Sequence, residues 1–281
     1  MDLGIFARTF TGTTPASVLQ AARAAGYRAV QYNMACSGLA SIPNAIAQDV
    51  ARAVSAASLD AGVKILAVSA TYNMVHPDRH VRMAGLSGLA AIAEKAHMMG
   101  TRALTLCTGT RDPHDRWKKH PDNGSSDAWR DLMESMEAAL RVSEKHDLDL
   151  AIEPEQANVV SSARRARCLI DGMKSSRLKV VLDPANLFDG ASASHQRSII
   201  AEAVDLLADR IVIAHVKDRL WNGSFVAPGK GLVEHKFFFE RLKTIGFSGP
   251  LVTHGLSEEE APQVATLLRC LLGELGIEIA P

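Results

Sequence analysis

A repeated unit of helix, glycine and short apolar run constrains the fold more than any other feature of this sequence. In four places a helical stretch ends at a glycine, and an apolar or β-branched run follows within a few residues. The glycines are Gly26, Gly62, Gly100 and Gly246, and the runs after them cover 29–32, 65–68, 103–106 and 251–253. Glycine adopts the left-handed conformation after a helix at little cost, so each glycine predicts a helix end that leads into a strand.

Four further apolar runs complete the series. They cover 3–6, 148–152, 178–182 and 211–214, and a helical pattern follows each of the last three. Strict alternation of strands and helices implies parallel strands joined by right-handed crossovers. Eight such units predict an α/β fold, a closed (β/α)8 TIM barrel, because a doubly wound sheet usually stops at five or six strands. No linker rich in Gly, Pro or Ser divides the chain, so we expect a single domain over 1–281.

Local signals agree with this count at two predicted helix starts. Thr14-Pro15 supplies a capping side chain followed by proline in the first turn. Ser257, with Glu260 three residues later, predicts a capping box whose acid faces the positive end of the helix.

The charge balance and the cysteines indicate which classes of partner and which cellular compartment to expect. The chain has 31 basic and 31 acidic residues, and this neutral balance argues against nucleic-acid and membrane-surface partners. The N-terminus has Asp2 and no export signal pattern, and no apolar run reaches the length of a membrane span, so we expect a cytoplasmic protein. Four scattered cysteines without a CxxC pair are typical of reduced thiols, and we expect all four to be packing residues: Cys36, Cys107, Cys168 and Cys270.

Polar residues follow the last four predicted strands, at the end of a barrel where functional groups lie. These strand ends read Glu153-Pro154-Glu155, Asp183-Pro184-Ala185-Asn186, His215-Val216-Lys217-Asp218 and Thr253-His254-Gly255. Carboxylate and imidazole donors in this ratio suit a divalent ion such as Mn, Co, Zn or Mg and exclude a soft thiolate site.

Each of these residues also has a purely structural interpretation. Glu153 can be an ion-pair partner in the barrel mouth, and Asp183 before proline can be a turn signal. His215 can be a hydrogen-bonded core histidine. His254 can ligate metal or instead face the substrate or support the ligands.

With these strand ends, the chain resembles the xylose isomerase-like TIM barrels, the sugar phosphate isomerase/epimerase family that also contains endonuclease IV and inosose dehydratase. The resemblance extends over nearly the whole chain. It also includes Tyr72-Asn73-Met74 with His76-Pro77, and Pro228-Gly229-Lys230-Gly231. It implies that Glu153, Asp183 and His215 hold one divalent metal ion, with Mn expected and Mg, Co or Zn as alternatives. It also implies a small carbohydrate substrate and a homo-oligomer.

Two positions depart from the family pattern. Asn186 stands where the family often has a histidine, and His254 stands where it usually has a glutamate on strand eight. The second exchange removes one of the two carboxylates that the family's epimerases use. His254 would then be a fourth metal ligand or a catalytic group.

The resemblance implies a metal-dependent isomerase or epimerase of a small sugar, ketose or cyclitol that works through an enediolate. Glu153 would be the base, and Lys217 and Asp218 would orient His215 or return the proton. The alternative is a metal-dependent lyase, which dehydrates or β-eliminates a keto sugar or 3-keto-glycoside from the same intermediate. A non-catalytic binding barrel is the alternative of another class.

Further residues are candidates for binding substrate. They are Asn73 and His76 after strand three, Arg111, His114 and Trp117 in the loop 107–123, and Glu155, Asn186 and Asp218 near the strand ends. The loop is long and charged, so it either covers the site or is simply solvated. No GxGxxG or GxxxxGK[ST] motif is present, so no nucleotide cofactor is expected.

Overall fold

A computed structural model describes residues 1–279, and in them the chain forms a closed barrel of eight parallel strands. Around the barrel the order is β1-β10-β7-β6-β5-β4-β3-β2. The strands are β1 (Leu3–Phe6), β2 (Ala29–Tyr32), β3 (Lys64–Ser69), β4 (Ala103–Cys107), β5 (Asp149–Glu153), β6 (Leu178–Leu182), β7 (Ile211–Val216) and β10 (Leu251–Thr253). This confirms the predicted (β/α)8 barrel.

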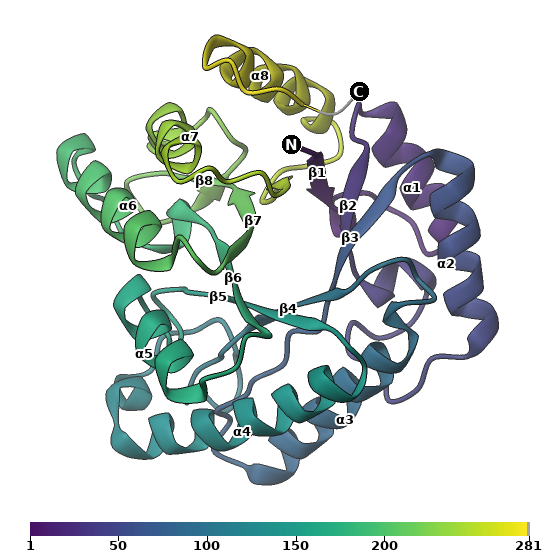
Figure 1. Ribbon diagram of the computed structural model, residues 1–281, viewed down its shortest axis with the longest axis vertical. Coiled ribbons are helices and arrows are strands. Elements are labelled where there is room, and N and C mark those ends of the chain that lie inside the picture. The colour runs from purple at the N-terminus through teal and green to yellow at the C-terminus, as the bar shows by residue number, and fades with distance from the viewer. Residues whose placement is uncertain (280–281) are drawn as a thin grey trace.

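Helices form a ring around the barrel (Figure 1). Those within the described residues are α1 (Pro15–Ala24), α2 (Gln48–Ala61), α3 (Arg79–Ala96), α4 (Ser126–Lys145), α5 (Ala163–Met173), α6 (Ala193–Leu207), α7 (His235–Thr244) and α8 (Ala261–Glu274). Short 3-10 turns follow four of the strands or loops: η1 (Ala7–Thr9), η2 (Met34–Ser37), η3 (Pro121–Gly124) and η4 (Pro184–Asn186).

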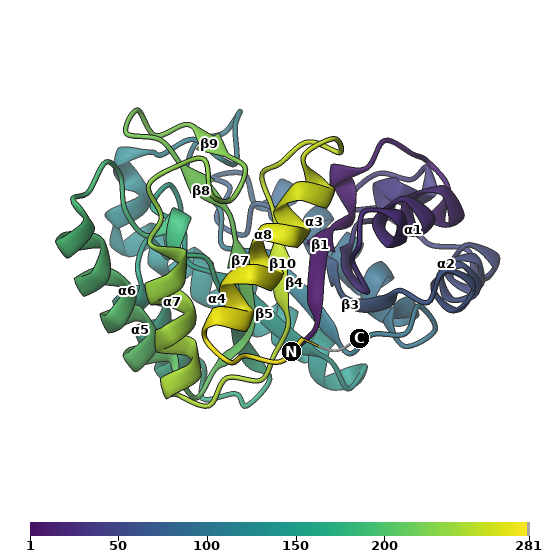
Figure 2. The same cartoon turned by 90° about the horizontal axis from the view of Figure 1, so that it is seen from above.

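A small antiparallel ribbon of β8 (Asp218–Arg219) and β9 (Phe225–Val226) lies outside the barrel sheet. Figure 2 shows this ribbon on the side where the barrel strands end, with both chain termini on the opposite side. The ribbon therefore belongs to the face that carries the candidate site.

The predicted helix ends are confirmed. The four glycines of the repeat all have positive φ, between 61° at Gly62 and 94° at Gly26, a region that other residues rarely occupy. At the start of α1, Thr14 accepts a hydrogen bond from the Ser17 N–H.

The predicted start of the last helix is wrong by a few residues. Glu260 accepts a hydrogen bond from the Ser257 N–H at 2.8 Å, as expected for half of a capping box. However, residues 258–260 form a turn, and α8 begins only at Ala261. Pro262, in the first turn of α8, needs no N–H partner there, which suits this later start.

An apolar layer inside the barrel forms the floor of the candidate site. It includes Ala151, Val181, Ile213 and Val252, all buried. Side chains on a strand alternate between its two faces, so the residue two positions further on points to the same interior. Those residues are Glu153, Asp183, His215 and His254.

The expectation that all four cysteines are packing residues is wrong for two of them. Cys36 and Cys107 are buried, whereas Cys168 on α5 and Cys270 on α8 are exposed on the outer helices. Burial and the nearby Glu153 carboxylate raise the pKa of Cys107 well above its usual value, so its thiol stays protonated and is a poor nucleophile.

Candidate metal centre

The strand ends of β5, β6 and β7 bring three metal-binding side chains together. One donor atom each from Glu153, Asp183 and His215 lie within 4.8 Å of one another. Glu153 and His215 line a cavity of about 480 Å³ at the mouth of the barrel, and Asp183 is fully buried beside it. The juxtaposition expected from the sequence is therefore present.

The hydrogen bonds of His215 leave one ring nitrogen facing a carboxylate. Gln31 donates from Nε2 to Thr105 Oγ1 at 3.1 Å, which turns its carbonyl oxygen toward His215 Nε2 at 2.7 Å. Nε2 then carries the proton, and the other nitrogen, Nδ1, lies 3.2 Å from Glu153 Oε1. In the neutral imidazole these two atoms both present electron pairs, so a cation or a proton must be shared between them.

Asp183 supplies a second observation that fits a bound cation. Its Oδ1 accepts a hydrogen bond from the Ala185 N–H at 2.9 Å. Its Oδ2 is buried and accepts no hydrogen bond from any residue in 1–279, although Lys217 Nζ lies 3.4 Å away. Burial and the Glu153 charge raise the pKa of Asp183, and Lys217 opposes them. Leaving a buried carboxylate oxygen unsatisfied is costly, so these residues fit a divalent ion with oxygen and imidazole ligands.

His254 lies beside this cluster without being part of it. Its ring stacks on Phe6 at 4.9 Å and on His215 at 5.6 Å, between ring centres. In the described part of the chain its buried Nδ1 has no hydrogen-bond partner. Burial, with the charges of Lys217 and His215, lowers the pKa of His254 to about 3, so the ring is neutral. Its role as a fourth ligand stays a prediction.

A hydrogen-bonded chain links Glu153 to Lys217. Asn186 donates to Glu153 Oε1 at 2.6 Å, and Lys217 Nζ donates to Asn186 Oδ1 at 2.7 Å. Burial raises the pKa of Glu153, but the charges of His215 and Lys217 outweigh burial and hold it at about 2. Asn186 thus connects the ammonium group to the carboxylate at the position where the family often has a histidine.

Glu155 lines the cavity two residues beyond Glu153. Burial and the neighbouring Glu153 charge raise the pKa of Glu155 to about 7. One of its oxygens accepts a hydrogen bond from Asn158 at 3.1 Å. A third carboxyl group is therefore present at the site, besides those of Glu153 and Asp183.

Apart from Asp183, which is buried beside the cavity, the predicted site residues fall into two groups. Those that line the cavity are Glu153, Glu155, Asn186, His215, Lys217 and His254, together with Trp117. Those that are not among its lining residues are Asn73, His76, His114, Arg111 and Asp218. The substrate contacts proposed for the second group stay predictions, and most of these side chains have other partners.

The β3–α3 and β4–α4 loops are tied together by Asn73 and His76. Asn73 donates to the Thr110 carbonyl at 2.8 Å and accepts from the Thr110 N–H at 3.1 Å. His76 Nε2 lies 3.1 Å from the Pro113 carbonyl oxygen, and the neighbouring His114 is exposed. These contacts hold the loop that carries Trp117 against the barrel.

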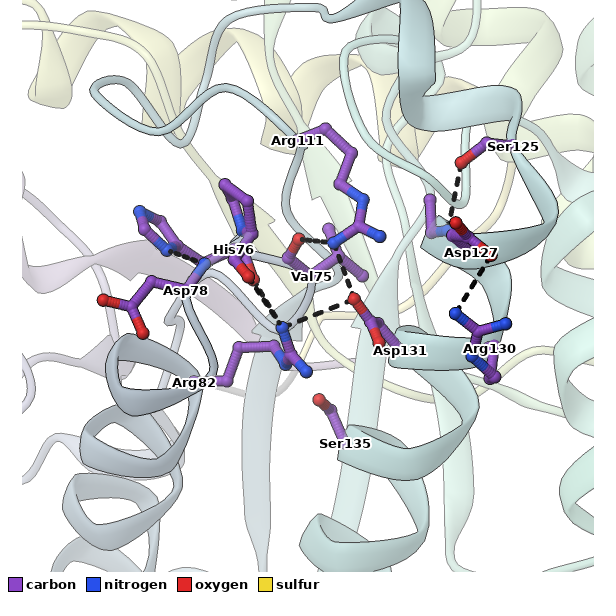
Figure 3. Close-up of polar contacts among 12 residues, drawn as sticks. Val75, His76, Asp78, Arg82, Arg111, Ser125, Asp127, Arg130, Asp131 and Ser135 are labelled. Atoms are coloured by element: carbon purple, nitrogen blue, oxygen red, sulfur yellow. Dashed lines mark hydrogen bonds and ion pairs between the residues drawn. The ribbon is translucent and has the colours of Figure 1, made fainter.

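Figure 3 shows the ion-pair network that supports the same loops. Asp131 on α4 pairs with Arg111 at 2.6 Å and with Arg82 on α3 at 3.3 Å. Both arginines also donate to the β3–α3 loop, Arg111 to the Val75 carbonyl and Arg82 to the His76 carbonyl. Arg111 thus fixes the loop geometry.

Asp218 organises the segment between β7 and α7. Its carboxylate accepts hydrogen bonds from the backbone N–H groups of Gly229, Gly231 and Val233, at 2.9 to 3.0 Å. A Cβ on Gly231 would lie 2.3 Å from this carboxylate, so the glycine permits the close approach.

Residues from the first half of the barrel were missed by the sequence reasoning. Gln31, Phe6, Arg8 and Thr105 all line the cavity. Gln31 did carry a signal, because it is a single amide within the run Ala-Val-Gln-Tyr of a buried strand. A buried polar side chain needs a partner, and here the partner is His215.

A profile of the xylose isomerase-like TIM barrel family matches residues 19–271. The chain belongs to this family. No protein of curated function matches the sequence. Within residues 1–279, none of the helices combines the length and the apolar character that crossing a membrane requires.

Solved structures of this family share the fold at low sequence identity. The Escherichia coli protein YcjR, described as a 3-keto-D-glucoside 4-epimerase, has a TM-score of 0.77 at 15% identity, covering 96% of this chain and 99% of its own. A xylose isomerase domain protein from Planctomyces limnophilus has a TM-score of 0.75 at 21% identity, covering 98% of each chain. The IOLI protein, described with a bound zinc atom, has a TM-score of 0.72 at 15% identity, covering 98% and 99%.

Proposed function

We propose that this protein is a divalent-metal-dependent isomerase or epimerase that acts on a small sugar, ketose or cyclitol. The convergence of Glu153, Asp183 and His215 within 4.8 Å, at the rim of a cavity of about 480 Å³, carries this proposal. A cavity of this size accepts a small polar molecule. The description of YcjR as a keto-sugar epimerase supports carbohydrate chemistry in this fold.

A divalent ion bound by these three residues would supply Lewis-acid polarisation of a carbonyl and its neighbouring hydroxyl, which acidifies the adjacent C–H bond. Mn²⁺ is the ion to test first, followed by Mg²⁺, Co²⁺ and Zn²⁺, since all accept oxygen and imidazole ligands.

Glu153 is the proposed base. Its Oε1 is held by Asn186 and faces His215, whereas Oε2 contacts the Cys107 thiol at 3.9 Å. Oε2 is thus the oxygen better placed to accept a proton from substrate. Lys217, which also lines the cavity, is the proposed group for returning a proton to the sugar, and the neutral His254 beside it is proposed to hydrogen-bond the substrate.

A lyase is the second candidate, and His254 favours it. His254, the residue after β10, is a neutral imidazole, whereas epimerases of this family usually have a glutamate at this position. Proton removal by Glu153 would then be followed by loss of a β-substituent instead of proton return.

Incubation of the Mn²⁺-loaded protein with ketoses and keto-glycosides in heavy water tests the proposal. We expect solvent deuterium at the carbon next to the carbonyl. Glu153→Gln should abolish this exchange because it removes the proposed base, with metal content measured in the variant because Glu153 is also a proposed ligand. An enone product would indicate the lyase. Absence of both exchange and elimination across the substrate panel, with metal shown to be bound, would contradict an enzymatic role.

A further inference from the structure

The cavity has an acidic side and a basic side. The three carboxyl groups at the site, Glu153, Glu155 and Asp183, all follow β5 or β6. The other wall is formed by lining residues between 6 and 117, which lie on or after β1 to β4. Of the described residues that line this wall, none is an Asp or Glu, and two are arginines, Arg8 after β1 and Arg116 in the β4–α4 loop.

Neither arginine is neutralised by the protein. Ion pairs within residues 1–279 use other arginines, and neither Arg8 nor Arg116 joins one. Arg116 donates one hydrogen bond, from Nη1 to the Thr71 carbonyl at 3.1 Å. A guanidinium group has five N–H donors, so most of this capacity is available to a ligand.

Arg219 shows the contrasting, structural use of an arginine nearby. Its Nη1 donates to the Ala185 carbonyl at 3.0 Å, and its Nη2 pairs with Asp189 at 2.8 Å. Its guanidinium is buried and bonded on several sides, whereas Arg8 and Arg116 are exposed toward the cavity mouth. The two cavity arginines are therefore not needed to hold the loops in the same way.

The charges of the site leave these arginines in surplus. Even with all three carboxyl groups ionised, Lys217, buried against Asp183, and one divalent ion would together balance them. Arg8 and Arg116 then give the cavity an excess of two positive charges. Uncompensated charge of one sign in a concave site attracts ligands of the opposite sign. Neutral hydrogen-bonding residues line the same cavity, namely Asn33, Ser41, Ser69 and Thr71.

We propose that the substrate is an acidic sugar, with a carboxylate or phosphate group bound by Arg8 and Arg116 while the reacting carbonyl lies at the Glu153 side. This inference rests on the proposed function and names its substrate class. The planar guanidinium fork matches carboxylate and phosphate equally, so anion recognition is the shared chemistry.

Three matched ketoses test this proposal by calorimetric titration of the full, Mn²⁺-loaded chain: D-fructose, D-fructose 6-phosphate and D-fructuronate. They differ at the carbon remote from the carbonyl, which carries a hydroxyl, a phosphate or a carboxylate. We expect at least one anionic ligand to bind about tenfold or more tightly than fructose, because one charged hydrogen bond contributes roughly that factor. Whichever anionic ligand binds more tightly shows whether the site prefers a sugar phosphate or a sugar acid.

Arginine variants locate the anion. Arg8→Gln and Arg116→Gln should each reduce the preference for the anionic ligand by about tenfold, and fructose binding should change little. Both residues are exposed, so the barrel should remain folded, which circular dichroism checks. Arg52→Gln, at an exposed position of α2 outside the cavity, is the matched control and should leave all three affinities unchanged.

Equal affinity for the three ligands, or no binding of any, would overturn the proposal. So would an anion preference that persists in both arginine variants, because the anion would then be bound by another cation of the site, Lys217 or the metal. The affinities and the deuterium exchange are separate measurements, so the two proposals fail separately. An arginine-dependent anion preference without any deuterium exchange would refute the isomerase function and leave the anion site in place.

Discussion

Gln31 fixes the orientation of His215, a residue of the candidate metal centre, from the opposite half of the sequence. It lies 184 residues from His215 in the chain, and its carbonyl oxygen is 2.7 Å from His215 Nε2. A partner of this kind selects the tautomer and leaves the other ring nitrogen for a metal. Its effect on metal binding therefore measures whether His215 is a ligand.

We expect Gln31→Met to weaken Mn²⁺ binding by roughly 10- to 100-fold, the range usual for partners of metal-binding histidines. Methionine preserves the approximate volume but cannot accept the Nε2 hydrogen bond. Titration calorimetry gives the affinity, and Gln31→Glu should retain most of it because it keeps an oxygen acceptor. Unchanged affinity in the methionine variant would show that His215 needs no orientation or does not bind metal.

Among the elements, the segment from β8 to the start of α7 depends on one buried carboxylate. Asp218 accepts hydrogen bonds from Gly229, Gly231 and Val233, and His235 Nε2 lies 3.4 Å from Oδ2. Burial raises the pKa of Asp218, but the neighbouring His235 and the hydrogen bonds from these backbone N–H groups outweigh it and hold the pKa below its usual value. The ionised form therefore stabilises the folded chain.

Asp218→Asn should lower the free energy of unfolding by about 1 to 3 kcal/mol near neutral pH, because an amide N–H₂ then faces backbone donors. A depressed folded-state pKa gives stability that is present above the unfolded-state pKa and is lost as pH falls through the folded one. The difference between variant and wild type should thus shrink below about pH 4. Urea unfolding at several pH values measures it. Asp60→Asn, at an exposed position of α2, should change stability by less than about 0.5 kcal/mol.

At the scale of the whole molecule, the features that depend on short stretches of sequence were predicted, whereas those that depend on long-range contacts were missed. Each glycine of the repeat acts on its own helix end, so the alternating strands and the barrel followed from short stretches of sequence. The position of Glu153 and His215 directly after apolar runs also predicted that they lie at the mouth of the barrel. Arg8 and Gln31 were missed because only closure of the barrel between β1 and β10 brings them to the later strands. Asn73 was expected near substrate, yet its polar atoms bond the adjacent loop instead.

The metal and the barrel should be separable, since they depend on different parts of the molecule. The core that joins strands to helices is a continuous apolar shell, whereas the donors at the site are three polar residues on neighbouring strands. Ligand binding to the native state raises apparent stability with ligand concentration. Asp183→Ala should therefore stay folded, lose stoichiometric Mn²⁺ and show no rise in Tm when Mn²⁺ is added, unlike the wild type.

Asp183→Asn refines this last experiment, because the two carboxylate oxygens of Asp183 have different roles. Oδ1 accepts the Ala185 N–H at the start of η4, and Oδ2 is the oxygen offered to a metal. Asparagine can keep the first contact and removes the charge. Burial and Glu153 disfavour this charge whereas the ion pair with Lys217 favours it, so the metal-free Tm of the variant should lie close to that of wild type. Metal content by atomic absorption and Tm by calorimetry give both readouts. Undiminished metal in both variants would remove Asp183 from the ligand set, and a metal-free Tm of Asp183→Asn well below wild type would show that the carboxylate is structural.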